Sequence, residues 1–165
     1  MNTSSRLLIQ GIRLIVETAR WLCILALVVL VPAMVLAFAE PEAVMERVGP
    51  VGKGSGHLLL LANVRIAIII MLLGRLRRVV ATVSRGTPFE VGNVGRLRDI
   101  SLAMIGLALV PIILPPLIPS ALRDRLDMDV VAFSPGLWLG ALIVLTIAEV
   151  FREGARLRED ADLTI

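Results

Sequence analysis

The chain has 165 residues, of which 57% are hydrophobic, and its formal net charge is +3. A soluble domain of this length carries more polar surface, and here the apolar residues gather in four blocks. Four membrane helices with short connections would use most of the length, which excludes a separate soluble enzyme domain. Sixteen of the seventeen basic residues are arginines that flank the apolar blocks. Contact with anionic lipid head groups therefore explains the charge better than direct nucleic-acid binding does.

The amino-terminal part combines an amphipathic segment with an uncharged block. Within residues 1–20, five polar residues fall in one stripe of roughly 80° on a helix: Arg6, Gln10, Arg13, Glu17 and Arg20. This pattern indicates either a helix lying at the cytoplasmic interface or an inward extension of the first span. Residues 21–39 are uncharged and are predicted to be that span. Residues 40–55, acidic at first and then rich in Gly and Pro, are predicted to be an irregular loop.

The second apolar block leads into a segment rich in arginine. Residues 56–74 are predicted to be the second span, with Arg65 near its middle. Residues 75–98 hold six arginines, and their spacing predicts that the second helix continues beyond the membrane until Gly86 ends it. Thr87 would cap a new helix with Pro88 at its first position and Glu90 completing a capping box. The expected result is a helical hairpin between the second and third spans.

The third and fourth apolar blocks differ in their interruptions. Residues 100–117 are predicted to be the third span, and three prolines should kink it or loosen its outer end: Pro111, Pro115 and Pro116. Residues 135–151 are predicted to be the fourth span, with Glu149 close to its inner end. Charged residues then recur at steps of three and four through residues 152–165, which predicts that the fourth helix continues into the cytoplasm.

The distribution of basic residues predicts the orientation. Residues 1–20, 75–99 and 152–165 hold twelve of the seventeen bases, whereas the two remaining loops hold four. Positive charge is retained on the cytoplasmic side, so both termini and the central hairpin are expected there. The sequence thus predicts one domain over residues 1–165, an all-α, four-transmembrane-helix bundle.

Chemistry-bearing residues are sparse. The chain has one cysteine, Cys23, and one histidine, His57, and its spans contain no cluster of carboxylates. No nucleophile–base pair and no metal-ligand set can be assembled from these residues, so we expect no catalytic, cofactor-binding or metal site and no enzyme activity.

Two segments resemble a known family. They are GTPFEVGNVGRLRDI (residues 86–100) and AEVFREGARLREDADLTI (residues 148–165). They are similar to the central and carboxyl-terminal signatures of a bacterial membrane family of unknown function with four membrane helices. Members of that family are often encoded beside a very short helix-turn-helix regulator of the Cro/C1 type. The resemblance implies a fold and a possible protein partner, and it implies no reaction.

Both signatures fall on the side predicted to be cytoplasmic, where we expect them to pack together. The candidate interaction face consists of Pro88, Phe89, Asn93, Arg96, Arg98, Phe151, Arg152, Glu153, Arg156, Arg158, Glu159 and Asp160. The leading hypothesis is a non-enzymatic membrane protein that recruits a protein partner, such as a small transcriptional regulator, through this face. The alternative is a small transporter or channel subunit that uses an intramembrane pair of Arg65 and Glu149.

Overall fold

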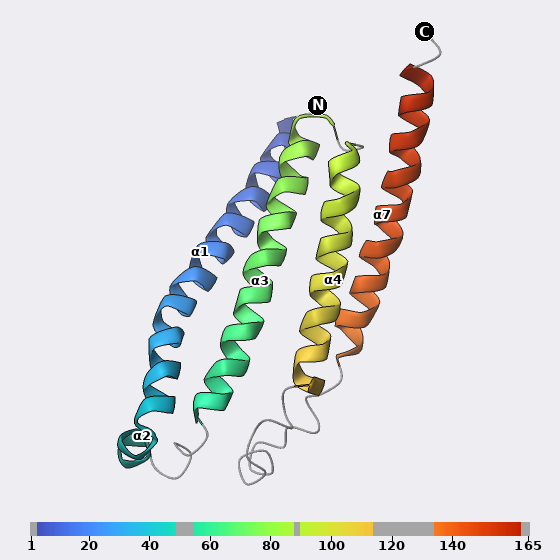
Figure 1. Cartoon of the computed structure of the whole chain (residues 1–165). Helices are drawn as coiled ribbons and strands as arrows, with labels where there is room; N and C mark the ends of the chain where they lie inside the picture. The colour runs from blue at the N-terminus through green and yellow to red at the C-terminus, as the bar shows by residue number, and fades with distance from the viewer. Residues whose placement is uncertain (1–2, 49–54, 88–89, 114–133, 163–165) are drawn as a thin grey trace.

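The computed structural model of the chain describes residues 3–48, 55–87, 90–113 and 134–162 (Figure 1). The regular structure in these residues is helical and consists of α1 (Thr3–Ala39), α2 (Pro41–Val48), α3 (Ser55–Ser84), α4 (Val91–Ile113) and α7 (Pro135–Asp162). The all-α class predicted from the sequence is therefore confirmed for the described part of the chain.

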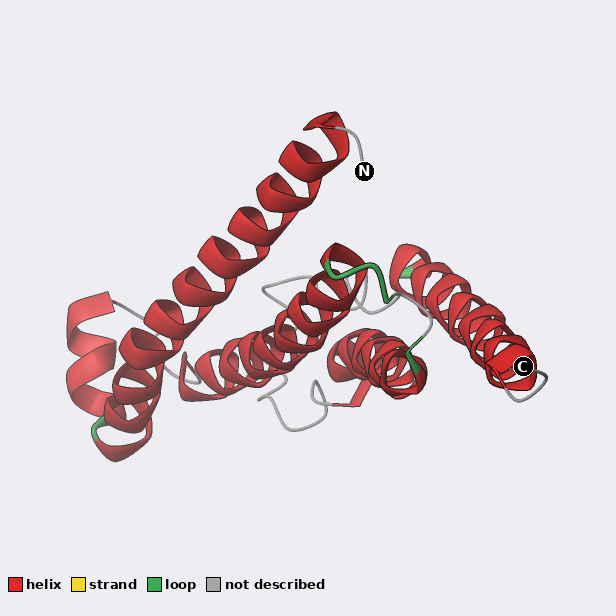
Figure 2. Cartoon of the chain, turned by 90° about the horizontal axis from the view of Figure 1, so that it is seen from above, coloured by secondary structure: helices red, strands yellow, loops and turns green. Residues whose placement is uncertain are grey.

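The four long helices lie in a row and run alternately in opposite directions (Figures 1 and 2). α1 packs on α3, α3 on α4, and α4 on α7, so each interface joins neighbours in the chain. α1 and α7 form the two edges. The predicted bundle takes the form of an open row, and α1 and α7 expose large apolar side chains such as Leu25 and Leu142.

Three helices in the described residues are long and apolar enough to cross a membrane: Leu7–Ala39, Ser55–Ser84 and Pro135–Leu157. Most of their side chains are not buried by protein, which suits helices surrounded by lipid. α4 carries three charges near its start, and its described apolar part ends at Ile113. A span needs about 20 apolar residues. The predicted third span includes residues 114–117, which lie outside the described residues.

Several predicted helix extensions are present as continuous helices. α1 runs without a break through the junction of residues 20 and 21, so the amphipathic segment extends the first span rather than lying apart from it. α3 continues to Ser84 and α7 to Asp162, as the spacing of their charges predicts. In these extensions the helices carry charged side chains beyond their apolar stretches.

α2 corrects the prediction of an irregular loop over residues 40–55. It begins with Pro41 at its first position, where the missing amide proton costs nothing, and Glu42 lies in its first turn near the positive end of the helix dipole. The glycines and prolines that suggested a loop lie from residue 49 onward. The helix-forming residues before them, Pro41–Val48, indicate a helix.

α4 and α7 approach each other through small residues. The buried side chains of these two helices include Ala103, Ala108, Ala141, Ala148 and Ala155. The Ser101 hydroxyl donates a hydrogen bond to the carbonyl of Ala141 (2.8 Å). Small residues let helix backbones come close, and close approach stabilises helix pairs in lipid, where the hydrophobic effect between helices is absent.

Candidate interaction surface at the end that holds the termini

The long helices have their ends at two opposite sides of the molecule. Both ends of the described chain and the connection from α3 to α4 lie at the same one of these sides (Figure 1). We call this the termini end. α7 reaches past the start of α4 here, so one side of its last turns is left without a neighbouring long helix. Both sequence signatures therefore lie at the termini end, as predicted, and their packing can be followed residue by residue.

The turn after α3 is fixed by Gly86, which has φ = 77°. The Thr87 amide donates to the Thr82 carbonyl (3.1 Å), and the Gly86 amide donates to the Val83 carbonyl (3.1 Å). These two bonds form a Schellman motif, which requires a left-handed residue that glycine adopts without steric penalty. The predicted helix end at Gly86 is confirmed.

The start of α4 differs from the prediction. α4 begins at Val91, and the hydroxyl of Thr87 donates to the Thr82 carbonyl (3.5 Å) rather than capping α4. The Asn93 amide donates to the Glu90 carbonyl (2.8 Å), so Glu90 stands at the helix entry. Thr87 therefore belongs to the end of α3, and the expected capping box is not formed.

A buried polar link joins α3 to α4 directly beneath this turn. Asn93 Nδ2 donates to Thr82 Oγ1 (2.6 Å), and the Thr82 hydroxyl donates to the carbonyl of Val79 (2.7 Å). Arg96 Nη1 donates to Asn93 Oδ1 (2.8 Å). Asn93 and Thr82 are completely buried. A buried amide that keeps its hydrogen bonds fixes the position of α4 against α3.

An apolar cluster lies next to this link and extends to α7. Its buried members are Val79, Leu97, Ile100 and Ala148, and Phe151 packs against them. The cluster takes side chains from α3, α4 and α7. The described residues of the two signatures therefore pack together here, with Leu97 of the first and Phe151 of the second in one cluster.

Each long helix is also joined to the next by an ion pair. Glu17 of α1 pairs with Arg77 of α3 (3.0 Å), Arg75 of α3 pairs with Asp99 of α4 (3.1 Å), and Arg98 of α4 pairs with Glu149 of α7 (2.6 Å). These side chains are partly exposed, so the pairs contribute more to the relative placement of the helices than to stability.

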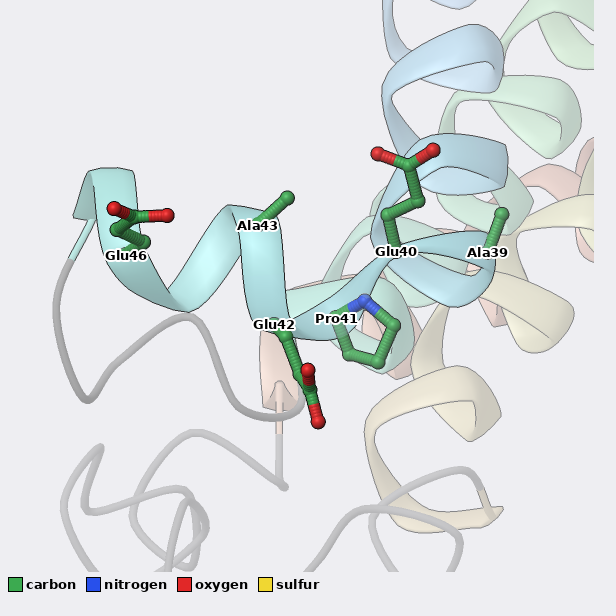
Figure 3. A pocket seen from close by; sticks show the side chains of 6 residues that line it. All are labelled: Ala39, Glu40, Pro41, Glu42, Ala43 and Glu46. Atoms are coloured by element: carbon green, nitrogen blue, oxygen red, sulfur yellow. The ribbon is translucent and has the colours of Figure 1, made fainter.

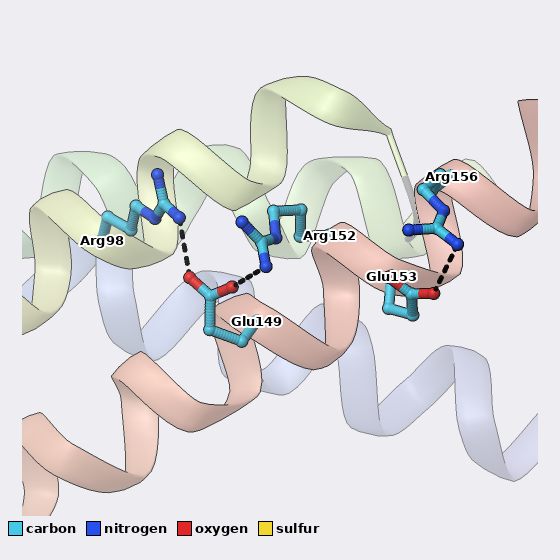
Figure 4. A network of polar contacts seen from close by, with 5 residues as sticks. All are labelled: Arg98, Glu149, Arg152, Glu153 and Arg156. Carbon is cyan, nitrogen blue, oxygen red and sulfur yellow. Dashed lines mark hydrogen bonds and ion pairs between the residues drawn. The ribbon is translucent and has the colours of Figure 1, made fainter.

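The last pair belongs to a short network along α7 (Figure 4). Glu149 accepts from Arg98 through Oε1 and from Arg152 through Oε2 (2.9 Å). One turn further on, Arg156 pairs with Glu153 (3.4 Å). Of these contacts, the Arg98–Glu149 pair joins α7 to α4, and the other two lie along α7.

A shallow groove lies beyond this network, between the start of α4 and the last turns of α7. It has a volume of about 460 Å³. Its walls are formed by Val94, Gly95, Arg152, Ala155, Arg156 and Glu159. Val94 and Ala155 are buried at its base, and the charged side chains stand at its rim. Leu157, on the same part of α7, exposes 59% of its surface. An apolar base with a charged rim is the usual composition of a protein contact site.

The groove contains some of the predicted face and excludes other parts of it. Arg152, Arg156 and Glu159 line the groove, and Glu153 and Arg98 take part in the network beside it. Phe151 packs in the apolar cluster, and Asp160 is exposed on α7. Pro88, Phe89 and the side chain of Arg158 lie outside the described residues.

Asn93 and Arg96 require a correction. Asn93 has no exposed surface, so its role is to hold α4, and it cannot contact a partner in this arrangement. Arg96 is turned toward Asn93 rather than toward the acidic residues of α7. The sequence placed these residues at the right end of the molecule but did not reveal which of them face inward.

The structure does not bring Arg65 and Glu149 together. Both carboxylate oxygens of Glu149 are engaged by Arg98 and Arg152. Among the described residues, no ion pair joins Arg65 to an acidic side chain. The expected pair fails because Arg98, on the helix packed next to α7, is in direct contact with the carboxylate.

Sequence reasoning missed all three ion pairs between the long helices, among them that of Glu17 in α1 with Arg77 in α3. It gave Asp99 no partner, although Asp99 pairs with Arg75. A lone acidic residue at the inner end of an apolar block, as Asp99 is, was the available signal for a contact with a neighbouring arginine.

The end of the helices opposite the termini end carries acidic side chains. Glu40, Glu42 and Glu46 surround an open hollow of about 610 Å³ where α1 meets α2 (Figure 3). The arginines of α1 and α3 that take part in ion pairs or pockets lie toward the termini end. The charge of the described residues therefore differs between the two ends of the helices, with arginines toward the termini end and glutamates at the other end.

Comparison with known proteins gives a family. A family model described as "Protein of unknown function (DUF2975)" matches residues 17–165. No curated protein and no solved structure matches the chain. The matched residues include all of α2, α3, α4 and α7 and most of α1, and hence every residue of the groove. The chain belongs to the DUF2975 family of proteins of unknown function.

Proposed function

We propose that this chain is a multi-pass protein of the bacterial cytoplasmic membrane that crosses the bilayer four times and places the termini end in the cytoplasm. The alternating directions of the four long helices support this topology, in which we take α4 as the third span. The charge asymmetry supports the orientation, because arginines gather toward the termini end and glutamates at the α1–α2 corner.

We further propose that the protein is not an enzyme and that it recruits a protein partner through the groove between α4 and α7. The observation that carries this proposal is the groove itself, with Val94 and Ala155 at its base and Leu157 exposed on the same helix. The buried link at Asn93 and the cluster around Ala148 hold both walls in place. A preformed site loses less conformational entropy on binding.

The resemblance of the two signatures to a family encoded beside short regulators suggests which partner to test. A small helix-turn-helix regulator held at the groove would be kept at the membrane and away from its DNA. The membrane protein needs no DNA contact of its own in this scheme.

The test fills the groove without changing its charge. A Cβ added at Gly95 meets no atom within 4 Å, so the large side chain of Gly95→Trp has room to enter the groove. Gly11→Trp is the matched control, because Gly11 lies on α1 and is equally open. Tagged proteins are purified from native membranes in mild detergent, and the co-purifying proteins are identified by mass spectrometry.

The proposal expects a partner that co-purifies with the wild type and with Gly11→Trp and is lost with Gly95→Trp. Retention of the same proteins by both variants would contradict the groove as the binding site. Absence of any specific protein from the wild-type sample would contradict recruitment altogether.

The alternative of a transporter or channel subunit gains no support from the structure. Its intramembrane pair of Arg65 and Glu149 is not formed, since Glu149 is engaged by Arg98 and Arg152.

A further inference from the structure

A second pocket lies between α1 and α3, away from the groove of α4 and α7. It has a volume of about 400 Å³. Its walls are formed by Arg13, Arg20, Gly74, Arg77, Arg78 and Ala81. Four arginines from two helices thus point to one space. The pocket therefore gathers four positive charges from two helices.

Three of the four arginines of this pocket have no acidic partner among the described residues. Arg77 pairs with Glu17, which is the acidic residue that the described structure places beside it. Within the described part of the chain, the side chains of Arg13, Arg20 and Arg78 make no ion pair or hydrogen bond. Arg20 Nε is in addition buried without a hydrogen-bond partner. A buried guanidinium N–H without an acceptor is costly, so the site favours an anion that supplies one.

The surroundings of the pocket are those of a lipid head group. Trp21, the residue after Arg20, exposes 63% of its surface, and an exposed indole favours the interface between head groups and acyl chains. On α3, Met71 lies one turn before Gly74 and is also exposed. The pocket therefore opens at the point where the charged part of α1 and α3 changes to exposed apolar surface.

We propose that this pocket binds the phosphate of an acidic phospholipid, whose acyl chains lie along the exposed apolar surfaces of α1 and α3. Arginine suits this role because its planar guanidinium donates two parallel hydrogen bonds to phosphate oxygens. Gly74 leaves the space open, since a Cβ at this position would meet no atom within 4 Å. The inference rests on the membrane location proposed above and is independent of partner recruitment.

The experiment measures binding of phosphatidylglycerol to the purified full-length protein in neutral detergent, with a fluorescent phosphatidylglycerol as the probe. Arg20→Gln/Arg78→Gln removes two pocket charges and leaves the Glu17–Arg77 pair intact. Arg85→Gln/Arg156→Gln removes two exposed charges outside the pocket and is the matched control. We expect binding to the pocket variant to be weaker by about tenfold to thirtyfold, at about one kcal/mol per arginine. The control should change by less than about threefold.

A steric variant separates the pocket from general charge attraction. Gly74→Leu keeps every arginine, fills the space and replaces glycine in a helix by a better helix former, so folding should be preserved. Its binding of phosphatidylglycerol should fall at least as far as that of the arginine variant. Unlabelled phosphatidylcholine should not displace the probe, and inorganic phosphate at millimolar concentration should displace little of it.

Three results would overturn the proposal. Equal loss in the pocket and control arginine variants would show unspecific attraction, and unchanged binding by Gly74→Leu would show that the pocket is not entered. Full displacement by inorganic phosphate would assign the pocket to a free anion instead of a lipid. Because the measurement is made in detergent, its outcome does not depend on which side of the membrane the termini end faces.

Discussion

The α1–α3 interface and the contacts of α4 hold helices together with different kinds of side chain. α4 is held on both sides by buried small or polar side chains, among them Asn93, Ser101 and Ala108. On α1, by contrast, Val16 and Ala37 are the buried side chains among those described. The other described side chains of α1 stay partly or fully exposed, and an open pocket lies between α1 and α3.

The difference is clearest at two buried asparagines. Asn93 makes hydrogen bonds of 2.6 and 2.8 Å through both ends of its amide. Asn63 donates from Nδ2 to the carbonyl of Leu30 at 3.3 Å and to the sulfur of Met34 at 3.6 Å, and its Oδ1 is buried without a partner. In lipid, polar contacts and close packing hold helices together. We infer that buried polar contacts contribute more to the placement of α4 than to that of α1.

The largest effect is expected from overpacking the α4–α7 contact. Ala148→Phe places a ring where no surface is exposed, and this should destabilise the fold by about 3 kcal/mol. Leu142→Phe is the control, because Leu142 on the same helix exposes 61% of its surface and should tolerate the ring. Thermal unfolding in detergent measures both. Similar melting temperatures for the two variants would show that α4 and α7 are not closely packed.

The next effect tests the buried link between α3 and α4. Asn93→Leu removes the donor to Thr82 and the acceptor for Arg96, and the loss should cost about 2 kcal/mol. A double-mutant cycle with Thr82→Val measures how much of this loss depends on the pair. Additive losses would mean that the two side chains act independently, contrary to the buried link.

A smaller loss is expected at the turn between α3 and α4. Gly86→Ala forces a Cβ into a left-handed conformation and should cost about 1 kcal/mol. A Cβ at Gly86 meets no atom within 4 Å, so the loss comes from the backbone and not from a clash. Gly74→Ala, within α3, is the control and should gain about 0.5 kcal/mol. Unfolding by denaturant distinguishes the two signs, and a gain at both glycines would contradict the left-handed turn.

The smallest effect is expected on the α1 side. Asn63→Leu removes long hydrogen bonds and an unpartnered oxygen, so its net change should lie within about 0.5 kcal/mol of zero. The same chemical change at Asn93 is the comparison, measured under the same conditions. A loss at Asn63 as large as that at Asn93 would remove the distinction between the two sides.

The sequence predicts those features that depend on neighbouring residues. Gly86 ends α3 because few other residues adopt its conformation, and the charges after Glu149 follow the period of one continuous helix. The short helix α2 could also have been predicted from the sequence, since helix-forming residues follow Pro41. Local chemistry decides each of these features.

The features that the sequence leaves open depend on how helices are placed against each other. Asn93 is buried, and Arg98 rather than Arg65 contacts Glu149, because of the register between α4 and its neighbours. The arginine pocket likewise combines Arg20 of α1 with Arg78 of α3. Composition gives no register, so these contacts and the open row could not be derived from it.

In the proposed topology, the termini end lies in the cytoplasm. The junction of α1 and α2, called here the α1–α2 corner, lies on the other side of the membrane. Because Cys23 is the lone cysteine, Cys23→Ala gives a background for placing single cysteines. Gly95→Cys and Glu159→Cys mark the termini end, and Glu42→Cys marks the α1–α2 corner. A membrane-impermeant maleimide added to intact spheroplasts should label Glu42→Cys alone, and all three should react after the membrane is opened. Labelling of Gly95→Cys or Glu159→Cys in intact spheroplasts would contradict the proposed topology.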